Sequence, residues 1–416
     1  MRSTKVITKT ILLVSFISLF TDIASEMLYP VMPVYLRSIG FSILLIGILE
    51  GVAEATAGLS KGYFGNLSDV TGKRAPFVRA GYFLSAVSKP MLAVFAYPLW
   101  IFFARTLDRF GKGIRTGARD AILSDETTDE NKGRVFGFHR GMDTLGAAIG
   151  PALALIWLWI FPGQYRWLFF IAFFPGLLAV LLSFFLKDKK SKPSQSADKA
   201  ALSSSPSKKI TFFSFFSYWK KSTPTFRKLV AGLLIFTLLN SSDVFLLLIV
   251  RNRLVNVFLN NQQQADLWMI GIYIFYNLVY ALFSYPVGII ADKTGLKVML
   301  VFGLMIFSVV YTGMGFASTI VVFGILFFLY GIYAAATEGV SKALISNIAE
   351  RSETATAIGF YTGLASIFSL LASSLAGLLW IVFGAKVLFL TSGIGVFCVV
   401  IYLNFVVPKN AGKERP

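Results

Sequence analysis

The sequence has few charged residues and almost no cysteine or histidine. Only 14% of its 416 residues are charged, and it contains one cysteine and one histidine. The lone Cys398 excludes an internal disulfide framework and a thiolate metal cluster. The patterns H-E-x-x-H, C-x-x-C, G-x-S-x-G and Walker A are also absent, so we expect neither an enzyme nor an ATP-driven pump. We expect no bound metal and no cofactor.

Apolar and basic residues are abundant. The chain is 56% hydrophobic, contains 41 phenylalanines and has a formal net charge of +18. A soluble domain is about 45–50% apolar and about 25% charged, so this composition indicates a protein that faces lipid. A membrane-spanning helix needs about 20 mostly apolar residues. Such runs occur at roughly twelve places, namely 10–36, 43–65, 76–97, 98–119, 134–160, 166–186, 229–250, 267–291, 298–316, 319–344, 354–380 and 384–407. Charges interrupt the first, fourth and fifth runs, so hydropathy alone would score these three weakly.

Lysine and arginine are concentrated in the connections on one side of the predicted spans. They occupy the N-terminal tail, the 66–75 and 124–133 loops, the 187–228 stretch and the C-terminal tail. By the positive-inside rule, both termini and this central stretch face the cytoplasm, and we expect a bacterial inner membrane. This placement accounts for the basic charge without a nucleic-acid partner.

The 187–228 stretch divides the chain into two halves. Residues 187–209 are rich in lysine, serine and proline and predict a flexible cytoplasmic linker. Residues 210–222 interleave aromatic residues with lysine, which predicts a short segment lying at the membrane surface. The alternative is that 210–222 only leads into the seventh span. We expect one six-helix bundle at 1–186 and a second at 229–416.

The two halves repeat each other. GNLSDVTGKR at 65–74 returns as GIIADKTGLK at 288–297, and RDAILSD at 119–125 returns as SKALISN at 341–347. Asp22 in the first span corresponds to Asp243 in the seventh. Two six-helix bundles of the same orientation are typical of a transporter with its site between the halves.

The repeated loop carries a family resemblance. Its first copy contains Gly65, Asp69, Gly72, Lys73 and Arg74, and its weaker second copy contains Gly288, Asp292 and Gly295. With the span number and the duplication, this pair resembles the major facilitator superfamily (MFS) of secondary transporters. The resemblance implies an all-α membrane protein with twelve transmembrane helices in two pseudo-symmetric six-helix bundles. It also implies that the loop latches the outward-facing state. On physical grounds we expect Lys73 and Arg74 to face anionic lipid. The alternative is that these charges only set the topology.

The fifth span has a distinctive spacing of small residues, formed by Gly137, Gly146, Gly150 and Pro151. This spacing resembles the motif of the antiporter branch, although Ala154 follows where a glycine is usual. We expect these residues to allow close packing with a neighbouring span across the halves. The alternative interpretation is generic packing of small residues.

Ionisable side chains inside the predicted spans are concentrated in the first half. Such residues are costly in lipid and are functional candidates by default. We expect acids of the first, second and fifth spans to face bases of the fourth, with Arg105 as counter-charge when a coupling proton leaves. The alternative is a structural lattice of ion pairs near the cytoplasmic ends, which fits the following bases better: Lys61, Arg109, Lys112, Arg115, Arg119 and Arg134. The proton-coupling candidates are Asp22, Glu26, Glu50, Glu54, Arg105, Asp108, His139 and Asp143.

His139 has no companion metal ligands, so a packed or hydrogen-bonded role is the simpler interpretation. A proton relay with Asp143 is the alternative.

The second half has fewer charges and a polar break at Asn240 to Asp243 in the seventh span. Glu338 and Lys342 are one turn apart and are expected to pair. We expect this half to shape the substrate site. Its cavity candidates are Asn240, Asp243, Tyr276, Asn277, Tyr280, Glu338, Tyr361 and Ser366.

These observations favour a secondary transporter that moves a small organic solute by proton-coupled antiport out of the cell. Uptake of an anionic metabolite or a siderophore–iron chelate is the second hypothesis, because the fourth span has a basic face. A lipid flippase is the third. The expected partners are the solute, protons and membrane lipids, and we expect a monomer.

Overall fold

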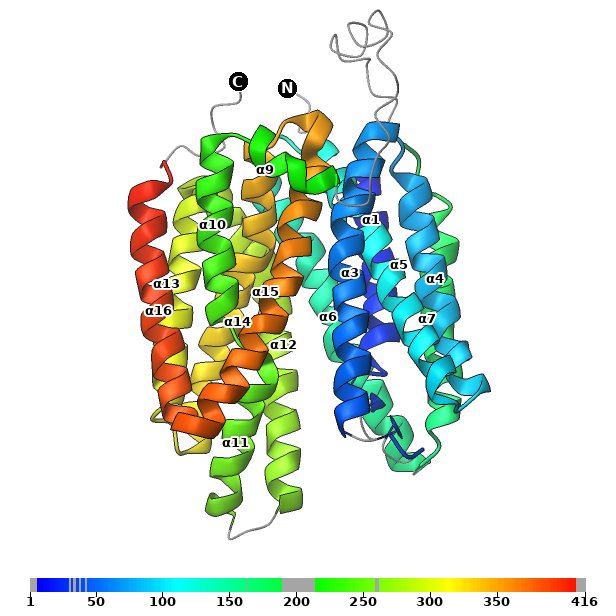
Figure 1. The fold of residues 1–416 in the computed structure, drawn as a ribbon, viewed down its shortest axis with the longest axis vertical. Helices are drawn as coiled ribbons and strands as arrows, with labels where there is room; N and C mark the ends of the chain where they lie inside the picture. The colour runs from blue at the N-terminus through cyan, green and yellow to red at the C-terminus, as the bar shows by residue number, and fades with distance from the viewer. Residues whose placement is uncertain are drawn as a thin grey trace, which may run out of the picture.

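Residues 6–29, 31–32, 35–36, 39–41, 43–161, 163–188, 214–258 and 262–408 are described by the computed structural model. Long α-helices make up most of this part of the chain (Figure 1). The first half contains α1 (Lys9–Glu26), α3 (Ile43–Thr71), α4 (Ala75–Val94), α5 (Pro98–Asp125), α6 (Lys132–Ile160) and α7 (Tyr165–Ser183). The second contains α10 (Pro224–Leu239), α11 (Asp243–Val257), α12 (Gln262–Thr294), α13 (Leu296–Met314), α14 (Ile320–Ile348), α15 (Thr354–Phe383) and α16 (Ala385–Val406).

Eight helical segments among the described residues are long and apolar enough to cross a membrane. They are α6, α7, the α10–α11 pair and α12 to α16. The charged helices α1, α3, α4 and α5 complete the twelve predicted spans. The fifth run was expected to have weak hydropathy, and this is wrong. The charges of α6 all lie before residue 144, so the rest of the helix is apolar enough to cross a membrane. By contrast, α3 and α4 are too polar to be recognised as spans by hydropathy, because Glu54, Lys61 and Lys89 lie well inside them.

The predicted polar break in the seventh span separates α10 from α11. Asn240 is extended, with φ −91° and ψ 96°, and ends α10. The hydroxyl of Ser242 then accepts a hydrogen bond from the backbone N–H of Val244 and begins α11. Because the break lies within the α10–α11 span, it places polar side chains in the middle of an otherwise apolar segment.

The central segment is described only from Ser214, so the predicted linker lies mostly outside the described residues. It contains η1 (Ser214–Ser217) and α9 (Tyr218–Lys221). Tyr218 is buried, with its ring centroid 5.1 Å from that of Phe226 and 6.2 Å from that of Phe360. Lys220 and Lys221 are exposed on the same short helix. The segment is therefore amphipathic, and it lies at the end of the bundle where α1 begins and α16 ends (Figure 1).

Each half is a helical bundle, and four helices form the main contact between the halves. α3 packs along α15, and α6 packs along α12. The contact is close because glycines face backbone across it. Gly65 lies against the carbonyl of Ala355, and Gly288 lies against the carbonyl of Gly133. We call this contact, near the 66–75 and 288–297 loops, the loop-side seam.

The two repeated loops close the loop-side seam in the same way. Asp69, at the end of α3, accepts hydrogen bonds from the backbone N–H and the hydroxyl of Thr356, at 2.7 and 2.8 Å. Asp292, at the end of α12, accepts from the backbone N–H groups of Gly133 and Arg134, at 2.7 and 3.1 Å. Each carboxylate thus caps a helix of the other half, where it interacts favourably with the helix dipole.

The basic pair of the first loop differs from the expectation. Lys73 is exposed, but Arg74 forms an ion pair with Asp125 at 2.9 Å and lies 3.5 Å from Asp69. Arg74 therefore contacts protein rather than lipid, because two carboxylates lie within its reach. Gly72 has φ +64°, the left-handed conformation that the tight turn after α3 requires.

Candidate substrate cavity

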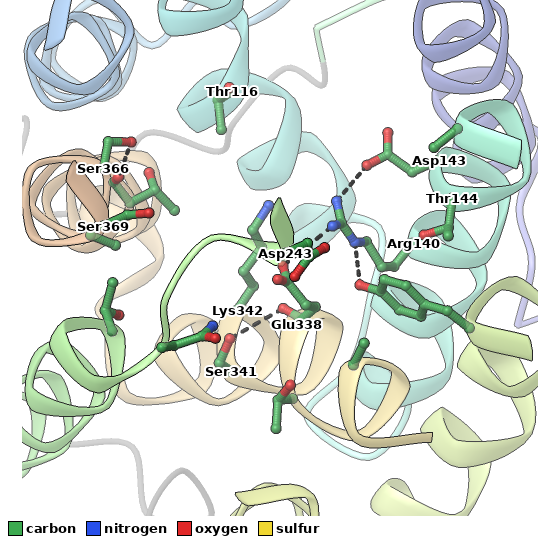
Figure 2. Close-up of a pocket in the computed structure, with 18 of the residues that line it drawn as sticks. Thr116, Arg140, Asp143, Thr144, Asp243, Glu338, Ser341, Lys342, Ser366 and Ser369 are labelled. Carbon is green, nitrogen blue, oxygen red and sulfur yellow. Dashed lines mark hydrogen bonds and ion pairs between the residues drawn. The ribbon is translucent and has the colours of Figure 1, made fainter. Parts of the chain in front are cut away.

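A cavity of about 490 Å³ lies between the two halves and is lined by side chains from both. Its second-half lining contains all of the residues predicted there, which are Asn240, Asp243, Tyr276, Asn277, Tyr280, Glu338, Tyr361 and Ser366. Of the coupling candidates, Asp22, Glu26, Glu54 and Asp143 line it. The Glu50 side chain is outside the described part of the chain. Figure 2 shows charged and polar side chains from several helices converging on this cavity.

Buried ion pairs connect the two halves beside the cavity. Lys342 on α14 lies 2.8 Å from the carboxylate of Asp120 on α5, which has no exposed side-chain surface. Arg119 binds the same carboxylate at 2.9 Å and lies 3.8 Å from Asp143 on α6. Bases on two helices therefore share one fully buried acid, which is costly to leave unpaired.

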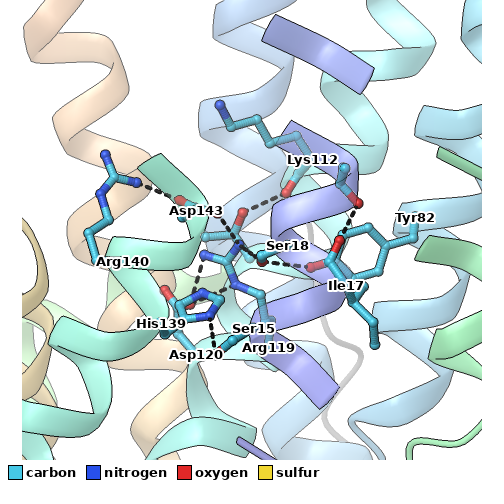
Figure 3. Close-up of polar contacts among 12 residues, drawn as sticks. Ser15, Ile17, Ser18, Tyr82, Lys112, Arg119, Asp120, His139, Arg140 and Asp143 are labelled. Carbon is cyan, nitrogen blue, oxygen red and sulfur yellow. Dashed lines mark hydrogen bonds and ion pairs between the residues drawn. The ribbon is translucent and has the colours of Figure 1, made fainter. Parts of the chain in front are cut away.

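A second link between the halves begins at Asp143. Arg140 lies 2.7 Å from Asp143 and 3.4 Å from Glu338 on α14, and its Nε donates a 2.5 Å hydrogen bond to the hydroxyl of Tyr280 (Figures 2 and 3). Glu338 and Lys342 were expected to pair with each other. Instead each pairs across the halves, because opposite charges from α5 and α6 lie closer. We call the alternating series the charge chain; it consists of Lys342, Asp120, Arg119, Asp143, Arg140 and Glu338.

Asp22 joins the charge chain through Asp143. The two carboxyl groups, from α1 and α6, lie within hydrogen-bonding reach of each other. Two carboxyls this close repel when both are ionised, and the repulsion is removed when one proton is bound between them. A pair of this kind can hold one proton between its two carboxyl groups.

The small residues of α6 position this carboxyl pair. The Cα of Gly146 faces the backbone of Leu19 and the Cβ of Asp22, and Gly150 faces the next turn of α1. Of the three glycines of the motif, Gly137 alone packs across the halves, against Ser284. The expectation that the whole motif would pack across the halves is therefore wrong, because α1 lies between the two later glycines and the second half.

Arg105 and Asp108 lie outside the cavity lining. Asp108 binds Lys89 at 2.6 Å, accepts a 2.5 Å hydrogen bond from the hydroxyl of Ser85, and lies 3.7 Å from Arg105. This cluster joins α4 to α5. The counter-charge role expected of Arg105 is instead available to Arg119 and Arg140, which contact Asp143.

His139 is a buried, packed residue rather than a cavity group. It is 3% exposed, and its Nδ1 lies 3.4 Å from the hydroxyl of Ser15 (Figure 3). No group of three or more potential metal ligands occurs among the residues that the structure describes.

The second-half wall is rich in tyrosine. Tyr330 donates a 2.7 Å hydrogen bond to Asp243, and its ring centroid lies 4.9 Å from that of Tyr276 and 5.1 Å from that of Tyr333. Asn240 donates to the hydroxyl of Tyr333, so the break between α10 and α11 is fixed to this wall. We call it the tyrosine wall; it contains Tyr273, Tyr276, Tyr280, Tyr330, Tyr333 and Tyr361.

Several lining residues were missing from the predicted site. The basic ones are Lys61, Lys112, Arg115, Arg119, Arg140 and Lys342. Asp120 was missed altogether, although it follows Arg119 directly. Its alignment with Lys342 in the internal repeat was the available signal, because equivalent positions of two facing halves lie at similar depths.

The chain matches the family model of the Major Facilitator Superfamily over residues 14–258 and 254–416. It is 34% identical over 374 residues to an uncharacterised MFS-type transporter of Methanocaldococcus jannaschii, a match that covers 90% of this chain and 89% of that protein.

Solved structures agree with this match at the level of the fold. The human organic anion transporter MFSD10 aligns with a TM-score of 0.74 and 16% identity, covering 95% of this chain and 98% of that one. The E. coli fucose:proton symporter FucP aligns with a TM-score of 0.74 and 12% identity over the same shares of the two chains. At identities this low, the similarity shows a shared fold and does not indicate the substrate.

Proposed function

Because the chain belongs to the major facilitator superfamily and is therefore a multi-pass membrane transporter, we propose that it exports a small organic solute by proton-coupled antiport. The observation that carries this proposal is the carboxyl pair of Asp22 and Asp143, which lines the cavity between the halves. The antiporter-like glycines of α6 support it, since Gly146 packs directly behind Asp22.

The charge chain gives the proton a way to act on the contact between the halves. With both carboxyls ionised, Asp143 binds Arg119 and Arg140 strongly. A proton on the pair weakens this hold on Arg140, which also binds Glu338 of the other half. Proton binding therefore changes the relative stability of the two arrangements of the halves, and a ligand that favours one arrangement shifts its population.

The proposed orientation follows from the loops. We infer that residues 1–186 and 229–416 form the two rocking bundles, in a bacterial inner membrane with both termini in the cytoplasm. The loop-side seam would then close the cytoplasmic face, and the present arrangement would be outward-facing. A monomer surrounded by lipid suffices, because the cavity is formed by one chain.

Flux measurements in reconstituted vesicles test the proposal. Purified chain is placed in liposomes with an imposed pH gradient, and proton movement is recorded when cationic, neutral or anionic aromatic solutes are added. We expect Asp22→Asn to lose at least tenfold of the gradient-driven flux, since it removes one member of the carboxyl pair. Glu130→Gln, which neutralises an exposed acid outside the cavity lining, is the control and should leave the flux unchanged. Flux that ignores the gradient, or that survives Asp22→Asn, would contradict proton antiport.

Proton-coupled uptake of an anionic metabolite is a second candidate. It is favoured by Lys112 and Arg115, which line the cavity and take part in none of the ion pairs among the described residues. Protonation of Asp22 would leave Lys112 with less negative charge nearby, so proton and anion would bind together. The same vesicles discriminate between the two, because symport moves solute and protons in one direction.

A further inference from the structure

We propose that Arg115, with Lys112 and Lys61, forms a binding subsite for the carboxylate of an organic anion. This inference names the substrate class of the cavity and rests on the proposed function only in taking this cavity as the transport site. It holds for either direction of transport.

The guanidinium of Arg115 is buried but incompletely hydrogen-bonded. The residue is 4% exposed and lines the cavity, and its Nε and Nη1 have no hydrogen-bond partner in the described part of the structure. Buried N–H groups are almost always paired with protein, water or a ligand. A guanidinium binds a carboxylate bidentately through Nε and Nη2 or through its two Nη groups, and each of these pairs contains one of the unsatisfied donors of Arg115.

Arg115 is held in position from behind. Its Cζ lies 4.6 Å from the centroid of the Tyr82 ring, in a cation–π contact. α4 packs closely here, because a Cβ on Gly81 would lie 2.7 Å from the Cβ of Arg115. A fork fixed in this way loses little conformational entropy when it binds an anion.

Two lysines add positive charge to the same part of the cavity. Lys112 is one turn before Arg115 on α5 and lines the cavity, as does Lys61 of α3, whose Nζ donates a 2.7 Å hydrogen bond to Ser366. Figure 3 shows Lys112 beside the charge chain. Asp22 and Glu54 lie within electrostatic reach of Lys112, but neither forms an ion pair with it among the described contacts.

The remaining bases that line the cavity are already neutralised. Arg119, Arg140 and Lys342 belong to the charge chain and bind acids there. The lining bases that form no ion pair among the described contacts are therefore Arg115 and the two lysines, which share the cavity with Asp22, Glu26 and Glu54. The tyrosine wall supplies an apolar and aromatic surface for the body of the anion.

Calorimetric titration of the detergent-purified full chain tests the subsite, with benzoate as the probe. Benzyl alcohol and benzylammonium have the same ring with a neutral or a positive group. We expect benzoate to bind and the other two to bind at least tenfold more weakly. We expect Arg115→Gln to weaken benzoate binding at least tenfold, and Arg115→Lys to restore only part of it, since lysine keeps the charge and loses the fork.

Arg227→Gln is the matched control, because Arg227 also has a buried Nε without a partner but lies outside the cavity lining. Should Arg115→Gln fail to fold, Lys112→Gln replaces it with the same expectation of weaker binding. Absence of benzoate binding, equal binding of benzylammonium, or unchanged binding in the folded Arg115 and Lys112 variants would overturn the inference. The titration uses no gradient, so loss of proton coupling with retained benzoate binding would overturn the proposed function alone.

Discussion

The two walls of the cavity are built from the same repeat but carry different chemistry. The first half contributes Asp22 and Asp143 with the bases of α5, whereas the second contributes the tyrosine wall around Asp243, together with Glu338 and Lys342. Asp22 and Asp243 are equivalent in the repeat, yet one faces a second carboxyl and the other accepts a hydrogen bond from Tyr330. Equivalent positions of the repeat thus lie in the same cavity but have different chemical surroundings.

Asp120→Asn should have the largest effect on stability, because it removes the negative charge to which bases of both halves bind. Asp120 has no exposed side-chain surface and binds Arg119 and Lys342 at 2.9 and 2.8 Å. Breaking a buried ion pair by removing one partner costs about 3–5 kcal/mol. We expect a large fall in the midpoint of thermal unfolding in detergent.

The same change on the other wall provides the comparison for Asp120→Asn. Asp243→Asn keeps an oxygen that can accept from Tyr330 and should lower the midpoint far less. Equal losses in the two variants would mean that the charged wall is not the more fragile one.

The helical spans and the second-half cavity residues could be predicted from the sequence. Hydropathy and loop charge predicted the spans, and the break after Leu239 lies where the polar run of the seventh span suggested. All eight second-half candidates line the cavity, because a polar side chain inside an apolar span has few other places to go.

Pairing between helices could not be predicted from one sequence. Glu338 and Lys342 satisfy the spacing rule for a pair on one helix, but each binds a partner on the other half. Arg105 was expected to be a counter-charge and instead joins a cluster with Asp108 outside the cavity lining. Which partner a charged side chain binds depends on the relative rotation and depth of the packed helices. Residue spacing along one helix carries no information about either.

Gly65→Ala should have an intermediate effect on stability, because it widens the loop-side seam without altering any charge. A Cβ on Gly65 would lie 2.5 Å from the carbonyl oxygen of Ala355, so the loop-side seam must widen. Overpacking of this kind costs about 1–3 kcal/mol. We expect faster thiol labelling of a cysteine at Ser346, which is 1% exposed, in a chain whose Cys398 is replaced by serine.

Gly51→Ala is the control for the seam variant, because a Cβ on Gly51 meets no atom within 4 Å. Its labelling rate should equal that of the parent chain. If both variants label at the parent rate, the glycine contact does not hold the seam closed.

Tyr330→Phe should have the smallest effect, and it tests whether the tyrosine wall is separate from proton coupling. The change removes the 2.7 Å hydrogen bond to Asp243 and keeps the aromatic ring, 4.9 Å from that of Tyr276. A hydrogen bond to a charged group contributes about 1.5–3 kcal/mol, and Asp243 lines the cavity, so part of that is recoverable by water. We expect a change of a few fold in apparent solute affinity, with the ratio of protons to solute unchanged in the vesicle assay. A change in that ratio would show that Asp243 takes part in coupling, which would then not be confined to the Asp22 and Asp143 pair of the first half.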